Sequence, residues 1–372
     1  MSQPKKHKVK IVRYILDSSL GWWRKNWWHK VLTIFVAIVF ACVGVMYGIA
    51  EWYINSQKNV PYNLGVTYIP DYAQYYGLDP VATLHAILTQ LGITNIRFVS
   101  YWSDIEPSPG VFDFSELDNE FAQAQAADMP VSLSIGLRQP RWPECHMPSW
   151  AANETEAQWY PQLKTFMAAV INRYKNSPVL QSYQLENEYF LKAFGECTNF
   201  SRSRLIDEYN FVKKLDPKHP IIISRSNNAV GLPIGKPTPD EFGVSVYKRV
   251  WDKSITHRYF EYPIPAWFYG FLAGAGKLLT GKNMIIHELQ AEPWPPNGDI
   301  LSTSIAEQNL SMNAQILASR FKYGEATGIK TIDLWGVEWW YWRMVDQHDP
   351  SLWNTAKAQF AWAKAQNAKL NH

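Results

Sequence analysis

The sequence predicts an α/β protein, a (β/α)8 TIM barrel that follows one N-terminal transmembrane helix. Residues 31–50 contain no charged side chain, and a run of this length suits a bilayer. From residue 63 onward, short apolar runs alternate with longer segments that have helical spacing. Eight such apolar runs can be counted, and eight strands alternating with helices favour a closed barrel.

The composition excludes several classes of protein. The chain has 372 residues, of which 47% are hydrophobic and 19% charged, so it can form a large core and is not disordered as a whole. Three cysteines are too few for a disulfide-rich scaffold or a four-cysteine zinc site. Residues 1–30 carry eight basic residues and one Asp, for a net charge of +7, whereas the rest carries 28 basic and 32 acidic residues, for −4. An acidic body argues against nucleic acid as a partner.

The apolar run at 31–50 sets the domain organisation. Twenty helical residues span about 30 Å, the hydrocarbon thickness of a bilayer. We expect a basic, aromatic cytoplasmic arm at 1–30, a signal anchor at 31–50, a linker at 51–62 and the barrel at 63–372. The positive flank stays in the cytoplasm, so the barrel is expected on the other side of the membrane. A buried core helix or a cleaved signal peptide is the alternative, but the basic region is long and no clear cleavage site follows.

The first half of the barrel follows in order along the chain. Each strand-like apolar run precedes a segment with helical spacing. The strands are expected at 64–68, 96–100, 131–135 and 181–185, and the helices near 80–91, 115–127, 154–174 and 202–215.

The second half continues the alternation, with an aromatic-rich helix at 263–279 expected to cover the barrel between strands six and seven. The remaining strands are expected at 221–224, 243–247, 284–287 and 331–335, and the remaining helices near 304–327 and 356–370. An open doubly wound sheet is the main alternative. No Gly-x-Gly-x-x-Gly motif follows the first strand, which disfavours a dinucleotide-binding version of that sheet.

Polar and aromatic residues follow the strands, at the end of a barrel where active sites lie. The residues at these ends are Tyr68, Asp71, Arg97, Tyr101, Trp102, Arg138, Arg141, Trp142, Glu186, Asn187, Glu188, Arg225, Asn227, Asn228, Tyr247, His287, Glu288, Trp335, Glu338 and Trp339. Glu188 and Glu288 each come directly after an apolar run, on opposed strands. Cleavage of a glycosidic bond needs such a pair, because one carboxylic acid protonates the leaving oxygen and the other attacks or stabilises the anomeric centre.

Around these two residues the sequence resembles the clan A glycoside hydrolases. The segment Gln184-Leu185-Glu186-Asn187-Glu188 is similar to the motif that ends strand four in that clan. The resemblance implies that Glu188 is the acid/base and that Asn187 binds the sugar 2-hydroxyl. Ile285-Ile286-His287-Glu288 is similar to the strand-seven motif, which implies that Glu288 is the nucleophile.

Further matches occur in the same order and register. Arg97 resembles the strand-two arginine that supports the nucleophile, Tyr247 the strand-six tyrosine that hydrogen-bonds it, and Trp335 the strand-eight tryptophan that forms the sugar platform. The segment 102–114, Trp-Ser-Asp-Ile-Glu-Pro-Ser-Pro-Gly-Val-Phe-Asp-Phe, is similar in style to the family 42 β-galactosidases. Family 5 is the other family that the chain resembles.

Other residues compete for these roles or accompany them. Glu186 shares the strand phase of Glu188 and is an alternative acid, and Glu292 is an alternative nucleophile that, like Gln290, is expected to bind substrate if Glu288 attacks. Tryptophan faces stack on sugar rings, so Trp102 and Trp339 are expected to join Trp335 in the cleft. Most of the 18 Trp residues are nevertheless expected to pack in the core.

The barrel also places Cys145 and Cys197 on neighbouring rim loops, after strands three and four, where a disulfide is geometrically reasonable. Two unpaired buried thiols are the alternative. The third cysteine, Cys42, lies within the membrane run.

The predicted function is an extracytoplasmic, membrane-anchored retaining glycosidase that acts on an oligo- or polysaccharide. Its two carboxyl groups are expected about 5 to 5.5 Å apart. Transglycosylation on the same site and a carbohydrate-binding barrel without turnover are the alternatives. We expect no cofactor and no catalytic metal, because the nine His residues show no His-x-x-x-His spacing. No Gly-x-Ser-x-Gly motif supports serine hydrolysis.

Overall fold

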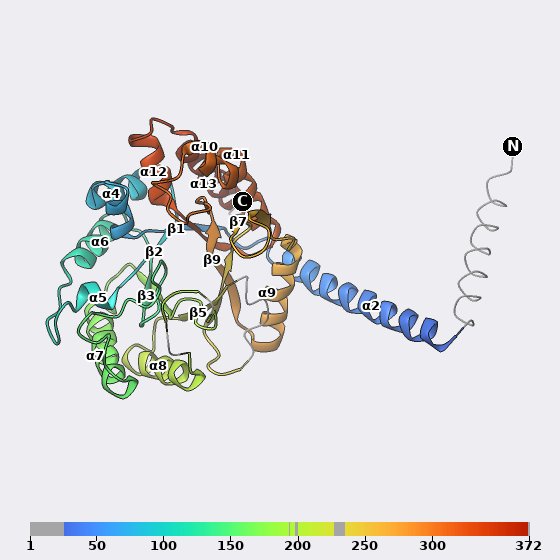
Figure 1. Cartoon of the computed structure of the whole chain (residues 1–372), viewed down its shortest axis with the longest axis horizontal. Coiled ribbons are helices and arrows are strands. Elements are labelled where there is room, and N and C mark those ends of the chain that lie inside the picture. Colours follow the sequence, from blue (N-terminus) through green and yellow to red (C-terminus); the bar gives the residue numbers. More distant parts are fainter. Residues whose placement is uncertain (1–25, 193, 198–199, 227–234, 371–372) are drawn as a thin grey trace.

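The computed structural model describes residues 26–192, 194–197, 200–226 and 235–370. Its centre is a closed barrel of eight parallel strands in the order β1-β10-β9-β6-β5-β4-β3-β2 (Figure 1). The strands are β1 (Asn63–Thr67), β2 (Asn95–Phe98), β3 (Val131–Ile135), β4 (Leu180–Leu185), β5 (Ile221–Arg225), β6 (Glu241–Val246), β9 (Asn283–Gln290) and β10 (Thr331–Trp335). The predicted TIM barrel is confirmed, and the open doubly wound sheet is excluded.

Helices surround the barrel and connect its strands (Figure 1). They are α3 (Pro70–Tyr75), α4 (Pro80–Gln90), α5 (Trp102–Ile105), α6 (Ser115–Ala126), α7 (Glu156–Tyr174), α8 (Arg202–Leu215), α9 (Ala266–Thr280), α10 (Ile305–Ser311), α11 (Ala314–Ala326), α12 (Val337–Val345) and α13 (Ser351–Leu370). Several begin at side-chain caps that satisfy free backbone N–H groups. For example, Asp79 accepts from the N–H of Ala82 at the start of α4, at 2.7 Å.

The structure differs from the sequence prediction in several connections, and the short helices α3 and α5 after the first two strands were not predicted. The helix expected at 304–327 is broken into α10 and α11, because Met312 is extended and Asn313 caps α11 by accepting from the N–H of Ile316 at 2.9 Å. The short helix α12 was not predicted. An antiparallel hairpin of β7 (Arg249–Asp252) and β8 (Arg258–Glu261), also unpredicted, leaves the barrel after β6.

The N-terminal apolar segment forms one helix, α2 (Trp27–Ser56), which projects away from the barrel in Figure 1. By length and composition α2 could cross a membrane, although a signal sequence would pass the same test. The helix continues past residue 50, so residues 51–56 are helical and only 57–62 connect it to β1. Most of the predicted cytoplasmic arm, residues 1–25, lies outside the described part of the chain.

The C-terminal part of α2 packs against α9 and thereby joins the barrel. Ala50 and Tyr53 are buried in this contact. Glycines of α9 allow the two helices to approach closely, since a Cβ on Gly274 would lie 2.9 Å from Cγ2 of Ile49 and 3.0 Å from the Ile49 carbonyl oxygen. The predicted helix between strands six and seven is therefore present as α9, and it is the contact surface for α2.

Candidate active site

A cavity of about 960 Å³ opens at the carboxyl ends of the barrel strands. Its wall contains residues that end or follow every one of the eight strands. Glu144 after β3, Glu188 after β4 and Glu288 near the end of β9 contribute carboxylates to this wall. The cavity therefore lies where barrel enzymes bind their ligands.

Glu288 lies near the end of β9 and is 3% exposed. Arg97, on β2, donates from Nη2 to Oε1 at 2.9 Å, and Tyr247, just after β6, donates from Oη to Oε2 at 2.8 Å. Arg97 is itself fixed by Thr67 and Gln184, whose side-chain oxygens accept from its Nε and Nη1. Both oxygens of Glu288 are thus held by donors, one from β2 across the barrel and one just after the adjacent strand β6, and the carboxylate has one defined orientation.

Glu188 follows β4 and has no basic side chain in direct contact among the described residues. Its backbone lies in the left-handed region, with φ of 40°, and its N–H donates to Oγ of Ser224 at 2.9 Å. Burial, and then the charge of Glu288, raise the pKa of Glu188 to about 7, against smaller opposing effects of Ser245, Arg138 and Ser226. Glu188 can therefore hold a proton near neutral pH beside a carboxylate that is fixed by donors.

Glu186 does not share the cavity with Glu188. β4 ends at Leu185, and Glu186 adopts a φ of 55°, so the period-two argument does not extend to these residues. The carboxylate of Glu186 accepts from the N–H groups of Leu137 and Arg138 at 2.8 and 3.1 Å, and Arg204 of α8 lies 3.2 Å away. Its role is structural, because it ties the β3 and β4 loops to α8.

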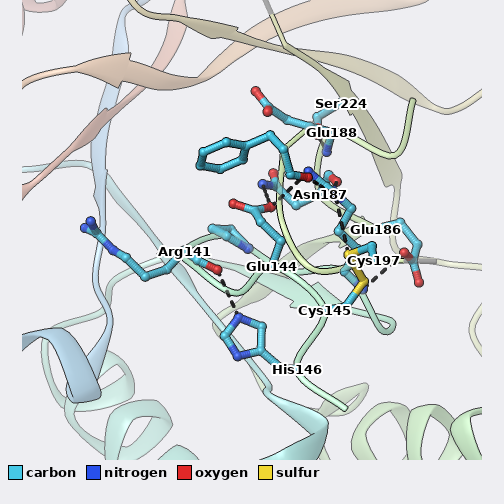
Figure 2. A network of polar contacts seen from close by, with 12 residues as sticks. Arg141, Glu144, Cys145, His146, Glu186, Asn187, Glu188, Cys197 and Ser224 are labelled. Carbon is cyan, nitrogen blue, oxygen red and sulfur yellow. Dashed lines mark hydrogen bonds and ion pairs between the residues drawn. A yellow bond between two sulfur atoms is a disulfide. The ribbon is translucent and has the colours of Figure 1, made fainter. Parts of the chain in front are cut away.

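Asn187 is also withdrawn from the cavity wall and is 2% exposed. Its Oδ1 accepts from Nε2 of Gln184 at 2.8 Å, and its Nδ2 donates to Oε2 of Glu144 at 3.0 Å. Figure 2 shows Glu144 beside Asn187 and Glu188. The side chain next to the acid/base candidate in the cavity wall is thus Glu144, which the sequence analysis did not single out.

Hydrogen bonds from two side chains position the carboxylate of Glu292, and these donors differ from those that hold Glu288, the nucleophile candidate. Its Oε1 accepts from Nη1 of Arg141 and from Nε1 of Trp335, at 2.9 and 2.8 Å. The Arg141 guanidinium lies over the rings of Tyr72 and Trp335, 3.3 and 4.3 Å from their centroids. Glu292, Arg141 and Trp335 form one part of the cavity wall, where they are placed to contact a ligand.

Besides Asn187, three more residues expected to bind substrate do not belong to the cavity wall. Trp102 and Trp339 are fully buried, and their indole N–H groups donate to Glu106 and Gln308. Gln290 is also fully buried, and its amide oxygen accepts from the N–H groups of Lys248 and Arg249 at the start of the β7–β8 hairpin, at 2.8 Å each. These side chains pack in the interior of the protein, behind the cavity wall. Their sequence position near the end of a strand could not predict this direction. The other indoles in the wall are Trp142 and Trp294.

Cys145 and Cys197 form a disulfide across 52 residues of chain, with Cα atoms 5.4 Å apart. The bond joins the loops after β3 and β4 and lies next to Glu144 (Figure 2). Of the predicted rim residues, Asn227 and Asn228 lie outside the described part of the chain.

A second cavity of about 260 Å³ adjoins the first, and Asp71 and Tyr101 belong to the walls of both. Asp104 and Glu120 also line it, and burial raises the pKa of Asp104 to about 6. In the part of the chain that the structure describes, no group of three His, Cys, Asp or Glu residues is arranged to hold a metal.

Comparisons with known proteins agree with this architecture. No protein-family profile matches the chain. A stretch of 138 residues is 29% identical to β-galactosidase BgaB of Geobacillus sp. (strain Y412MC61), covering 32% of this chain and 20% of that protein. The chain therefore spans about a fifth of the length of the curated relative that it matches.

Solved structures are similar in fold at low sequence identity. The exo-β-1,4-mannosidase Op5Man5 from Opitutaceae bacterium strain TAV5 aligns with a TM-score of 0.53 and 15% identity, over 84% of this chain and 60% of that one. The β-galactosidase of Halorubrum lacusprofundi gives 0.51 and 13%, over 73% and 52%. A family 10 endo-β-1,4-xylanase from Gloeophyllum trabeum gives 0.52 and 14%, over 82% and 97%. The resemblance to clan A glycoside hydrolases is confirmed at the level of the fold.

Proposed function

We propose that this chain is a retaining glycoside hydrolase, anchored in a membrane and acting outside the cytoplasm. One observation carries the enzymatic part of the proposal. The cavity holds a carboxylate fixed by two donors, Glu288, together with a carboxyl whose pKa is about 7, Glu188. Retaining glycosidases need a nucleophile and an acid with different protonation states at the same pH.

In the first step, an oxygen of Glu288 attacks the anomeric carbon while Glu188 gives its proton to the leaving oxygen. The glycosidic C–O bond breaks, and a glycosyl ester of Glu288 forms. In the second step, Glu188 takes a proton from water, whose oxygen attacks the anomeric carbon and releases Glu288. Two inversions leave the configuration of the sugar unchanged.

The electrostatics of the pair suit both steps. The charge of Glu288 is the second largest cause that raises the pKa of Glu188. When Glu288 is esterified this charge disappears, so the pKa of Glu188 falls and the side chain can act as a base toward water. The same carboxyl is therefore an acid before the ester forms and a base afterwards.

We infer β-linked oligo- or polysaccharides as the substrate class. The β-galactosidases, the β-mannosidase and the β-xylanase named above act on β-glycosides by their descriptions, and one structural neighbour from Streptomyces cattleya was solved with Manβ1-4GlcNAc. In this chain, the rings of Trp335, Trp294 and Tyr72 in the cavity wall offer aromatic surfaces for sugar rings.

A trapping experiment tests the mechanism. The full chain in detergent is incubated with aryl β-glycosides and the matching 2-deoxy-2-fluoro glycosides, and labelled peptides are mapped by mass. We expect turnover and a label on Glu288, with Glu288→Gln and Glu188→Gln each losing most activity. A label on Glu292 would overturn the assignment of the nucleophile. A folded protein that turns over no substrate and takes no label would contradict the proposed function.

A further inference from the structure

Glu144 is a third carboxylate of the catalytic cavity, beside the two that the mechanism uses. It follows β3 by nine residues, and its own φ is 70°. Its side chain belongs to the cavity wall together with Glu188 and Glu288. The mechanism proposed above leaves this group without a role.

The position of Glu144 is determined by its surroundings on several sides. Its N–H donates to the carbonyl of Arg141 at 2.7 Å, and its own carbonyl accepts from the N–H of Gln139 at 2.8 Å. The β4 loop packs over it, because a Cβ on Gly195 would lie 2.7 Å from the Cβ of Glu144. The adjacent residue, Cys145, is tied to that loop by the disulfide. The carboxyl group is thus presented to the cavity by a fixed backbone.

The charges that face Glu144 act in opposite directions. Arg138, at 3.5 Å, favours the ionised form, whereas Glu188 and Glu288 disfavour it. Burial is the largest effect, and together these raise the pKa of Glu144 well above that of a free Glu. Glu144 lines the same cavity as both reacting carboxyls, and the proposed mechanism requires the sugar ring to bind in this cavity.

In the present arrangement, the amide of Asn187 does not face the part of the cavity that Glu144 lines. Both ends of its amide are engaged, with Gln184 and with Glu144, and it is not part of the cavity wall. The resemblance to clan A assigns the sugar 2-hydroxyl to this asparagine. In this chain, Glu144 stands between the asparagine amide and the cavity.

We propose that Glu144, rather than Asn187, binds the hydroxyl next to the anomeric carbon of the substrate, and that Asn187 is a positioning residue that orients Glu144. The proposal rests on the proposed glycosidase function. Hydrogen bonds to this hydroxyl strengthen in the oxocarbenium-like transition state, so the contact raises kcat more than it lowers KM.

The test compares 2-hydroxy and 2-deoxy aryl glycosides of the best substrate, with wild type, Glu144→Ala and Glu144→Gln in the full chain. We expect Glu144→Ala to lose about 10-fold in kcat/KM on the 2-hydroxy substrate, as loss of one hydrogen bond in the transition state would cause. On the 2-deoxy substrate the same variant should remain within about threefold of wild type. Glu144→Gln, which keeps the shape and one acceptor oxygen, should fall between them.

The matched control is Glu196→Gln, an exposed carboxylate on the neighbouring loop, which should equal wild type on both substrates. Equal losses of Glu144→Ala on both substrates would overturn the proposal, because they would indicate a structural role. So would discrimination that disappears in Asn187→Ala but persists in Glu144→Ala. A wild type that cleaves neither substrate would instead refute the proposed function, and the inference with it.

Discussion

At the scale of single residues, Glu188 and Glu288 have the same side chain but different surroundings. Glu288 receives two hydrogen bonds from Arg97 and Tyr247, whereas Oε1 of Glu188 is buried and accepts none within the described part of the chain. Burial, and then the charge of Glu288, raise the pKa of Glu188 to about 7. An acid catalyst with this pKa works near neutral pH without a metal or a histidine as the proton donor.

The raised pKa predicts the basic limb of the pH profile. Since the first step needs protonated Glu188, kcat/KM should be constant below pH 7 and fall tenfold per pH unit well above it. The measurement is kcat/KM for a poorly activated aryl glycoside between pH 5 and 9. Glu188→Gln should abolish this limb, and a persistent limb in that variant would assign it to another group. A substrate with a good leaving group should depend less on the acid.

The sequence indicated that Glu188 and Glu288 lie at the rim because each follows an apolar run, and both line the cavity. It did not predict Glu144, whose place depends on a long loop with positive φ at Arg141 and Glu144. The one available signal was its neighbour Cys145, one of only two cysteines in the barrel. Trp102 was misassigned because the chain turns into a helix immediately after β2, which directs its ring into the core.

At the scale of elements, the contact between α2 and α9 depends on particular glycines. A Cβ on Gly274 of α9 would lie 3.0 Å from the Ile49 carbonyl oxygen and 3.0 Å from the Cβ of Tyr53, whereas a Cβ on Gly276 would lie 3.5 Å from the ring of Phe242. The first position has no room for a methyl group, and the second has an ordinary van der Waals contact.

We therefore expect Gly274→Ala to destabilise the protein by about 1 to 3 kcal/mol through overpacking. Gly276→Ala, in the same helix, should be neutral or stabilising by up to about 1 kcal/mol, because alanine is the better helix former. Thermal melting of both variants in the same detergent compares them directly. If the two variants melt at the same temperature, the close helix contact does not contribute to stability.

The disulfide is a second contact that acts at the scale of elements, because it joins the loops after β3 and β4, which carry Glu144 and Glu188. Closing a loop of 52 residues stabilises a fold by about 4 kcal/mol in the chain-entropy estimate. Cys197→Ser should lower the melting temperature and also reduce kcat/KM while the protein remains folded, because the Glu144 loop loses its anchor. Cys42→Ser, which alters the free cysteine of α2, is the matched control and should change neither. Unchanged kcat/KM in Cys197→Ser would show that the loop holds its shape without the bond.

At the scale of the whole molecule, the order of eight strands was predictable because parallel strands buried on both faces are continuous apolar runs. Most strand positions agree to within one or two residues. The β7–β8 hairpin was not predictable from periodicity, since each strand has only four residues, two hydrophobic or aromatic ones between two charged ones, and none of them is buried. The break between α10 and α11 depends on one capping Asn within an otherwise continuous pattern.

Membrane attachment is the prediction at this scale. The full chain should remain in the membrane pellet after alkaline carbonate extraction, and protease added to spheroplasts should reach the barrel. A variant with three Asp residues at Val36, Val39 and Val43, which are exposed on α2, should be released, because charges in the bilayer are costly. A wild-type barrel found free in the medium would instead show that α2 is a cleaved signal sequence.

The connection from α2 to β1 is short. After Ser56 only six residues remain before the first strand, and Tyr62 exchanges two hydrogen bonds of 2.7 Å with Asn367 of α13. In a membrane-anchored protein, such a connection would act as a short rigid link and not as a flexible tether. If α2 spans a membrane, as proposed, the short connection and the packing of α2 on α9 would make the barrel follow any tilt of that helix. The distance over which the cavity could search for substrate would then be set by the protein's fixed geometry.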